Sequence, residues 1–232
     1  MATFDEYVTL AENCYGDKAQ GEPDVYAWQT QKWEWATWYG DGFQGGVFVK
    51  GKECVVGFSG TKGGPTTAPI SQNTANARIG VNVIPNMAGS AFAMVNWAKK
   101  NYGATHAISI CGHSLGGGLA QVVGNWAGLP FISFNGPGMK THLKMSAFNI
   151  FKPRQLFRSA TSKNTDDSIG ICLTVDNDFV GNFGSHVGWK VDLGTYNPSH
   201  DMNSIFSLLV RRDWRHKSPR EVYSIWPASP AG

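Results

Sequence analysis

The chain of 232 residues has few charges, and this shortage excludes several classes of protein. Only 16% of its residues are charged, the net charge is +3, and the basic residues form no long block. A nucleic-acid-binding face needs a concentrated stripe of Lys and Arg, so we expect no nucleic acid partner. No apolar run is long enough to span a bilayer, and the first residues lack the basic start and apolar run of a secretory signal peptide. We therefore expect a cytoplasmic protein, or one secreted by a signal-independent route.

Cysteine is also scarce. The chain has four, Cys14, Cys54, Cys111 and Cys172. None forms a Cys-x-x-Cys pair and three lie in predicted apolar strands, so we expect buried free thiols. No clustered His and Cys spacing is present, and the triple glycine at 116–118 lacks the Gly-Lys-Ser/Thr of a phosphate loop. We therefore expect no metal and no cofactor.

Glycine is plentiful, with 28 residues, and one glycine pattern carries the functional prediction. The run Gly112-His113-Ser114-Leu115-Gly116 follows an apolar segment at 106–111 and precedes a helix-compatible segment at 115–129. In that context Gly-x-Ser-x-Gly is typical of a nucleophile elbow, a sharp strand-to-helix turn that exposes a serine hydroxyl. The alternative is a glycine-rich packing turn, but each helical glycine costs about 1 kcal/mol and needs a compensating reason. We therefore predict that Ser114 is a nucleophile.

The rest of the pattern predicts a single α/β domain over residues 1–232. A Thr3-x-x-Glu6 capping box begins an amphipathic helix that ends at Gly16. Glycine-rich turns join three strands, near Trp33, at 47–49 and at 54–58, into a meander. The later predicted elements are a helix at 86–101, a strand at 106–111, a helix at 115–127, strands at 131–134 and 169–175, a helix at 202–210 and a helix start at 218–221. This alternation implies a mainly parallel central sheet with an antiparallel N-terminal meander and helices on both faces.

Residues 60–85 are polar and rich in Gly, Pro, Thr and Asn, and we predict a long loop there. A lid at 62–85 fits this composition, because its larger apolar residues lie mainly near its end. We expect a mobile lid with a small apolar patch there.

The chain is also rich in tryptophan, with nine residues. Trp33 and Trp35 alternate with polar residues in the first strand, so they share one face of it. Packing under the N-terminal helix is favoured for them over a lipid-facing belt, because aromatic bodies are usually buried.

A serine nucleophile needs a base to take its proton and a carboxylate to orient that base. In elbow-type folds the chain order is Ser, acid, His, so both partners follow Ser114. The loop after strand 169–175 offers Asp176 and Asp178, although Asp-Asn-Asp is also ordinary turn chemistry. For the base, His186 and His200 both lie in predicted loops. The residues alone leave the acid and the base open.

Four landmarks, taken together and in order, resemble the class 3 lipases, the fungal-lipase-like α/β-hydrolases. They are Phe58-Ser59-Gly60-Thr61, Gly112-His113-Ser114-Leu115-Gly116-Gly117, Asp178-Phe179-Val180 and Ser199-His200-Asp201-Met202. The resemblance covers roughly residues 30 to 210. It implies an α/β-hydrolase fold with Ser114 as nucleophile, Asp178 as acid and His200 as base. It also implies an oxyanion hole formed by the backbone amides of Thr61 and Leu115.

The chain departs from that family at two positions. Ser59 stands where the family usually has Arg, and Gly181 stands where its Asp-x-Val-Pro run has Pro. Asp176 therefore stays as the fallback acid. His186 stays as the weaker alternative base, since relatives also carry a Gly-flanked histidine upstream of the catalytic one.

The function that the resemblance implies is a serine hydrolase that cleaves carboxylic esters of lipids, of the lipase or phospholipase A type. The alternatives are a short-chain or aryl esterase and a signal-less secreted antibacterial or effector phospholipase. A non-catalytic binding module is disfavoured because all three triad residue types occur in order. The expected partners are a lipid or ester substrate, a transient membrane or lipid-interface contact and, for an effector, a cognate inhibitor.

Overall fold

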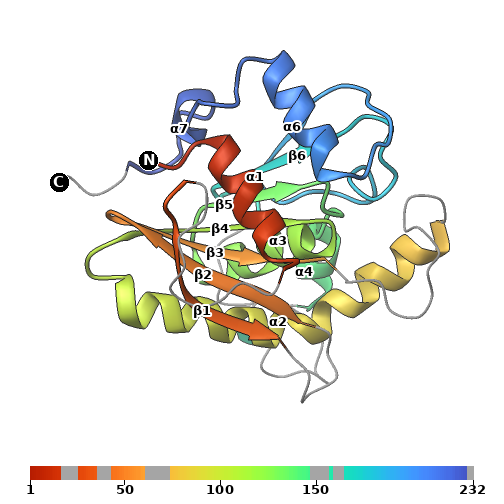
Figure 1. Ribbon diagram of the computed structural model, residues 1–232. Helices are drawn as coiled ribbons and strands as arrows, with labels where there is room; N and C mark the ends of the chain where they lie inside the picture. Colours follow the sequence, from red (N-terminus) through yellow and green to blue (C-terminus); the bar gives the residue numbers. More distant parts are fainter. Residues whose placement is uncertain (17–25, 36–42, 61–73, 147–156, 159–164, 229–232) are drawn as a thin grey trace.

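The computed structural model describes residues 1–16, 26–35, 43–60, 74–146, 157–158 and 165–228 (Figure 1). Seven strands form one sheet in the order β1-β2-β3-β4-β5-β6-β7. The strands are β1 (Gln29–Trp35), β2 (Gln44–Lys50), β3 (Glu53–Phe58), β4 (Ala107–His113), β5 (Phe131–Phe134), β6 (Gly170–Thr174) and β7 (Trp189–Asp192). The helices are α1 (Phe4–Asn13), α2 (Thr74–Tyr102), α3 (Leu115–Ala127), α4 (Lys140–Ser146), α6 (Met202–Arg211) and α7 (Pro219–Val222).

The sheet changes character at β3. Strands β1, β2 and β3 pair antiparallel, whereas every pair from β3 to β7 is parallel. In the parallel part Phe58 lies opposite Gly112, and His113 lies opposite Phe134. The carboxyl ends of β3, β4 and β5 therefore meet at one edge of the sheet, where ligands bind in open α/β folds.

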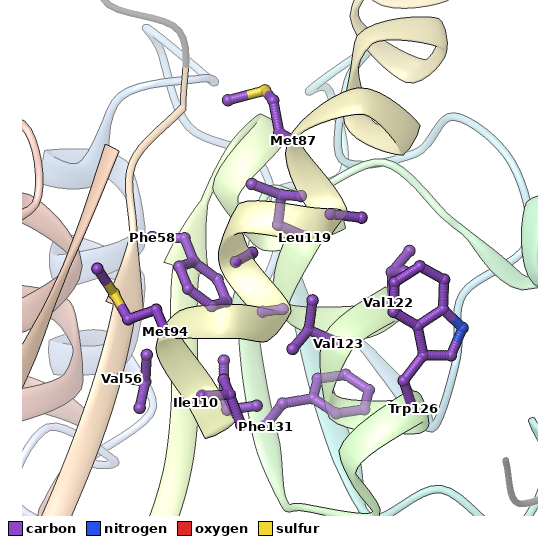
Figure 2. Packing of buried hydrophobic residues seen from close by; sticks show 14 of the residues in the cluster. Val56, Phe58, Met87, Met94, Ile110, Leu119, Val122, Val123, Trp126 and Phe131 are labelled. Carbon is purple, nitrogen blue, oxygen red and sulfur yellow. The ribbon is translucent and has the colours of Figure 1, made fainter. Parts of the chain in front are cut away.

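Helices cover both faces of the sheet (Figure 1). Helices α1 and α6 share a buried apolar cluster with one face, and α2 and α3 share another with the opposite face. Figure 2 shows the second cluster, in which Met94 lies near Val56 of β3, and Leu119 and Val123 of α3 point into the same space. The predicted fold class is confirmed: an α/β fold with a mainly parallel sheet, an antiparallel N-terminal meander and helices on both faces.

Helix α1 begins as its sequence predicts. Thr3 accepts the N–H of Glu6, and the Glu6 carboxylate accepts the N–H of Thr3, which forms a complete capping box. The helix is tied to the end of the described chain: Asp5 accepts a hydrogen bond from Arg215 Nε at 2.8 Å, and Phe4 N donates to the Lys217 carbonyl at 2.9 Å. Helix α1 is therefore held at its N-terminal end by the segment that follows α6.

Tryptophan and cysteine follow the sequence predictions where they are described. Trp33 packs, partly buried, against the apolar cluster that includes α1, and Trp28 is buried in the same cluster. The side chain of Trp35 lies outside what the structure describes, so its predicted packing stays a prediction. All four cysteines are buried and free. Within the described part of the chain, no helix is both long and apolar enough to cross a membrane.

The predicted loop at 60–85 is wrong in its second half, because α2 begins at Thr74 rather than at Asn86. The polar, glycine-rich composition belongs to 60–73, whereas 74–85 contains one glycine and one proline. Pro85 removes one helical hydrogen bond and favours a helix boundary, but the backbone continues as helix through it. The lid predicted at 62–85 therefore falls partly on a helix, and its residues 62–73 lie outside the described residues.

Two short elements have no counterpart among the sequence predictions. Helix α4 has seven residues, and β7 has four, of which three are exposed. Neither is long enough to show a clear period of apolar residues.

Candidate active site

Ser114 lies between β4 and α3 in a sharp turn. Its backbone has φ 57° and ψ −126°, a conformation that non-glycine residues rarely adopt and that costs energy. The helix after it has Leu119, Val122 and Val123 buried at helical spacing and ends at Gly128, whose φ is 65°. A strained serine between a buried strand and a buried helix is the geometry of a nucleophile elbow.

The two glycines that flank Ser114 allow the turn to close. A Cβ added at Gly112 would lie 2.3 Å from the Gly116 carbonyl oxygen, and a Cβ added at Gly116 would lie 2.2 Å from the Phe58 carbonyl oxygen. Both distances are far below van der Waals contact with backbone that cannot move aside cheaply. Close backbone approach is therefore the compensating reason for glycine at the start of α3.

Ser114 lies within hydrogen-bonding distance of one histidine. The His200 Nε2 atom is 2.8 Å from Ser114 Oγ, and His200 Nδ1 is 3.0 and 2.9 Å from the two carboxylate oxygens of Asp178. The carboxylate only accepts, so Nδ1 carries a proton and Nε2 is free to accept the Ser114 hydroxyl proton. The structure thus brings together the three residues that the resemblance selects.

Asp178 is held in place by its own loop. Its side chain is 1% exposed, and it accepts hydrogen bonds from the backbone N–H groups of Val180 at 3.3 Å and Gly181 at 2.9 Å. A Cβ added at Gly181 would lie 2.9 Å from Asp178 Oδ2, which is consistent with glycine rather than a larger residue in this loop. Asp176, the fallback acid, is exposed, and only Asp178 contacts His200.

His186, the alternative base, does not reach the serine. Its Nε2 atom donates to the Gly136 carbonyl at 3.0 Å. Burial lowers the pKa of His186, and its bond to that carbonyl opposes the shift. His186 instead ties the loop before β7 to the segment after β5.

Asn135 is a site residue that the sequence analysis missed. It follows β5, is fully buried and has φ 46°, which asparagine tolerates better than most residues. Its Nδ2 donates to the Ser199 carbonyl at 3.0 Å, and its Oδ1 accepts the Val175 N–H at 2.9 Å. Asn135 thereby joins the loop of Asp178 to the loop of His200. The only signal in the sequence was its place at the end of a predicted strand.

One of the two predicted oxyanion donors is described. Leu115 is the first residue of α3, where the backbone N–H has no acceptor within the helix and points toward the positive end of the helix dipole. Thr61, the other, lies outside the described residues. Before it, Ser59 N donates to the Gln44 carbonyl and Gly60 N donates to the Tyr15 hydroxyl, so neither amide is the donor.

No group of three or more His, Cys, Asp or Glu side chains is placed to hold a metal ion among the described residues. The site therefore consists of a serine, a histidine and a buried carboxylate at the carboxyl ends of parallel strands. Among proteins of known mechanism, that arrangement on an α/β fold is the constellation of the serine hydrolases.

No protein-family model and no curated protein matches the chain. Similar solved structures include the native Rhizomucor miehei lipase propeptide complex, with 14% identity and a TM-score of 0.39 over 57% of this chain. The match covers 51% of that chain, so this chain spans about half its length. The Lip2 lipase of Yarrowia lipolytica matches with 14% identity and a TM-score of 0.48 over 82% of this chain and 77% of that one. A hyperthermophilic esterase from Pyrobaculum calidifontis matches with 11% identity and a TM-score of 0.38, over 90% of this chain and 88% of that one.

Proposed function

We propose that the protein is a serine hydrolase that cleaves carboxylic esters of lipids, of the lipase or phospholipase A type. The observation that carries the proposal is the continuous hydrogen-bonded line from Ser114 through His200 to the buried Asp178. A hydroxyl, an imidazole and a carboxylate in that geometry perform acyl transfer on several unrelated folds.

The reaction follows from the positions of the three side chains. Ser114 Oγ attacks the ester carbonyl carbon as His200 Nε2 takes its proton, and Asp178 stabilises the resulting imidazolium. The tetrahedral intermediate places its negative oxygen near the Leu115 N–H, and we assign the second donor to Thr61. His200 then returns the proton to the leaving alcohol. Water, activated by the same histidine, releases the acid from Ser114.

A lipid substrate is supported by apolar surface beside the acid. Phe179 directly follows Asp178, is 39% exposed, and its ring centroid lies 6.0 Å from that of Phe183. A pair of partly exposed aromatic rings next to a reaction centre suits contact with an acyl chain or a lipid interface. The resemblance of the four sequence landmarks to class 3 lipases points to the same substrate class.

A short-chain or aryl esterase is the second candidate. It is favoured by the composition of residues 62–73, which are polar and rich in glycine and threonine and include one large apolar residue, Ile70. An amphipathic lid would be expected to carry more apolar surface there. The two candidates share the same chemistry and differ in chain length and in their response to an interface.

The test is hydrolysis of a series of p-nitrophenyl esters from acetate to palmitate, together with fatty acid release from phosphatidylcholine vesicles. Ser114→Ala is the control for both. Release from vesicles and a preference for long chains support the lipase or phospholipase proposal. Activity confined to acetate and butyrate selects the esterase. Failure of the wild-type protein to hydrolyse any ester contradicts the proposed function altogether.

A further inference from the structure

The residue before the nucleophile, His113, has no part in the line of proton transfer, yet its side chain is buried beside it. The His113 side chain is 7% exposed, and its ring centroid lies 5.1 Å from that of His200. Its Nε2 atom is 3.1 Å from the backbone oxygen of His200, and its Nδ1 atom is 2.9 Å from the hydroxyl of Tyr15. His113 therefore connects the main chain of His200 to Tyr15, which lies two residues after the end of α1.

The direction of these hydrogen bonds is set by the groups at the two ends. The His200 carbonyl only accepts, so His113 Nε2 must carry the proton and donate. In neutral imidazole Nδ1 then has a lone pair, which accepts the hydroxyl proton of Tyr15. The Tyr15 oxygen in turn accepts the N–H of Gly60 at 2.9 Å. The result is one chain from the Gly60 amide through Tyr15 and His113 to the His200 carbonyl.

Burial keeps this chain in a single protonation state. Burial, together with the nearby His200, lowers the pKa of His113 to about 3, and its bond to the His200 carbonyl opposes the shift only in part. Burial likewise raises the pKa of Tyr15 far above its ordinary value. The side chains of His113 and Tyr15 therefore stay neutral throughout the proposed proton transfer between Ser114 and His200. The pattern of donors and acceptors does not change during the reaction.

The two ends of this hydrogen-bonded chain are the His200 carbonyl and the Gly60 amide, and both belong to segments outside regular secondary structure. His200 lies in a turn between β7 and α6, outside any helix or strand. Its preceding carbonyl, that of Ser199, accepts from Asn135 and from the Ser204 hydroxyl, both at 3.0 Å. At the other end a Cβ added at Gly60 would lie 2.6 Å from the Tyr15 hydroxyl and 3.0 Å from Ser114 Cβ, so this turn packs directly on the nucleophile.

We propose that Tyr15 and His113 are positioning residues, which hold the His200 main chain and the Gly60 turn in register with Ser114. This inference rests on the proposed function and names two further residues that the same site needs. Neither side chain bonds to a reacting atom, so each acts through the placement of His200 and of the turn before Thr61. A displacement of about 1 Å at a reacting group can cost about 100-fold in rate.

Tyr7 of α1 supplies a matched control eight residues before Tyr15. Its hydroxyl lies 2.8 Å from Ser109 Oγ in the buried interface between α1 and β4, away from the triad. Tyr7→Phe and Tyr15→Phe each remove one hydroxyl from a tyrosine of the α1 segment. If Tyr15 has only a structural role, the two variants should have the same kcat per folded molecule. If Tyr15 positions the site, kcat should fall in Tyr15→Phe and not in Tyr7→Phe.

The test measures kcat and KM for p-nitrophenyl butyrate with the full chain, per molecule shown to be folded by circular dichroism. We expect Tyr15→Phe to lower kcat about 10-fold and leave KM unchanged, because the hydroxyl's hydrogen bonds to His113 and Gly60 are lost while no group that contacts the substrate changes. Tyr7→Phe should keep the wild-type kcat. His113→Phe should lower kcat about 100-fold, and His113→Gln, which can donate and accept, should restore most of it. If His113→Phe does not fold, Tyr15→Phe and His113→Gln decide the matter.

Two further results separate the outcomes. Tyr15→Phe in a His200→Ala background should leave the residual rate unchanged, because there is no longer a base to position. Equal kcat for Tyr15→Phe and Tyr7→Phe in an active protein overturns the positioning role and leaves the proposed function standing. A wild-type protein without esterase activity overturns the proposed function and this inference with it.

Discussion

Two aspartates of the chain, Asp5 and Asp178, are each 1% exposed and each paired with a basic side chain. Asp5 accepts hydrogen bonds from Tyr26 and Arg215, which close the N-terminal end of α1 onto the segment after α6. Asp178 accepts from His200 and from two backbone N–H groups of its own loop. A buried aspartate that pairs with a basic side chain thus occurs in two different regions of the molecule.

The difference lies in the partner. Arg215 keeps its charge at any working pH, so its pair with Asp5 is permanent and can only contribute to stability. His200 also contacts the Ser114 hydroxyl, so its pair with Asp178 can strengthen when the imidazole takes the proton of that hydroxyl. A buried aspartate beside a permanent cation indicates a structural contact, whereas one beside a histidine and a serine indicates chemistry. Each prediction below tests that distinction.

The largest effect is expected at Ser114. Ser114→Ala removes the only atom that can form the acyl-enzyme, so kcat for ester hydrolysis should fall about 10⁶-fold. The change leaves the backbone turn in place and removes a single hydrogen bond, so the free energy of unfolding should change by about 1 kcal/mol or less. Steady-state kinetics and urea denaturation check the two statements. Retained activity would contradict the assignment of the nucleophile.

The next effect concerns the acid. Asp178→Asn keeps the size of the side chain but removes the charge that stabilises protonated His200, so kcat should fall about 10⁴-fold. Asp176→Asn is the matched control two residues away, on an exposed side chain, and should leave kcat unchanged. A larger loss in Asp176→Asn than in Asp178→Asn would reverse the choice between the two aspartates.

Asp5→Asn should have the opposite profile. It leaves Arg215, whose side chain is 38% exposed, without its anionic partner, and we expect a loss of about 2 kcal/mol in the free energy of unfolding, less than for a fully buried pair. Per folded molecule, kcat should stay at the wild-type value. Chemical denaturation with parallel kinetics checks this. A fall in kcat without a fall in stability would break the comparison between the two aspartates.

The smallest effect is expected at His186. His186→Gln can still donate to the Gly136 carbonyl, so stability should change by about 0.5 kcal/mol or less. We expect no measurable change in kcat, because this side chain does not contact Ser114. If His186→Gln lowered kcat as much as His200→Ala does in the same assay, His186 would again be a candidate for the base.

The sequence predicts most of the fold where local signals and long-range packing agree. The capping box at Thr3, the glycine that ends α3 and the alternation of strands and helices each have a direct physical cause in nearby residues. The turn at Ser114 is predicted in the same way, because a strand, two glycines that allow close backbone approach and a helix lie next to one another in the chain, and the catalytic role of Ser114 stays a prediction. Its partners Asp178 and His200 came from the resemblance of short motifs, and their catalytic roles stay predictions.

The parts of the fold and of the site that the sequence does not predict depend on contacts between distant parts of the chain. Tyr15 and Asn135 form hydrogen bonds with residues dozens of positions away in the chain, such as His113, which is 98 residues from Tyr15. No local sequence pattern predicts these contacts. The start of α2 was missed because the proline at 85 favours a helix boundary that the rest of the helix overrides. Strand β7 is too short to show a period.

The bond between Asp5 and Arg215 joins residues 210 positions apart. A chain is made from its N-terminus, so α1 leaves the ribosome long before the segment that contains Arg215. The hydrogen bonds of Phe4 and Asp5 to the segment after α6 therefore form only once that segment has been synthesised. Tyr15, two residues after α1, reaches its place over Gly60 and His113 only as that helix docks. In the nascent chain Ser114 therefore emerges before the segment that fixes the N-terminal end of α1.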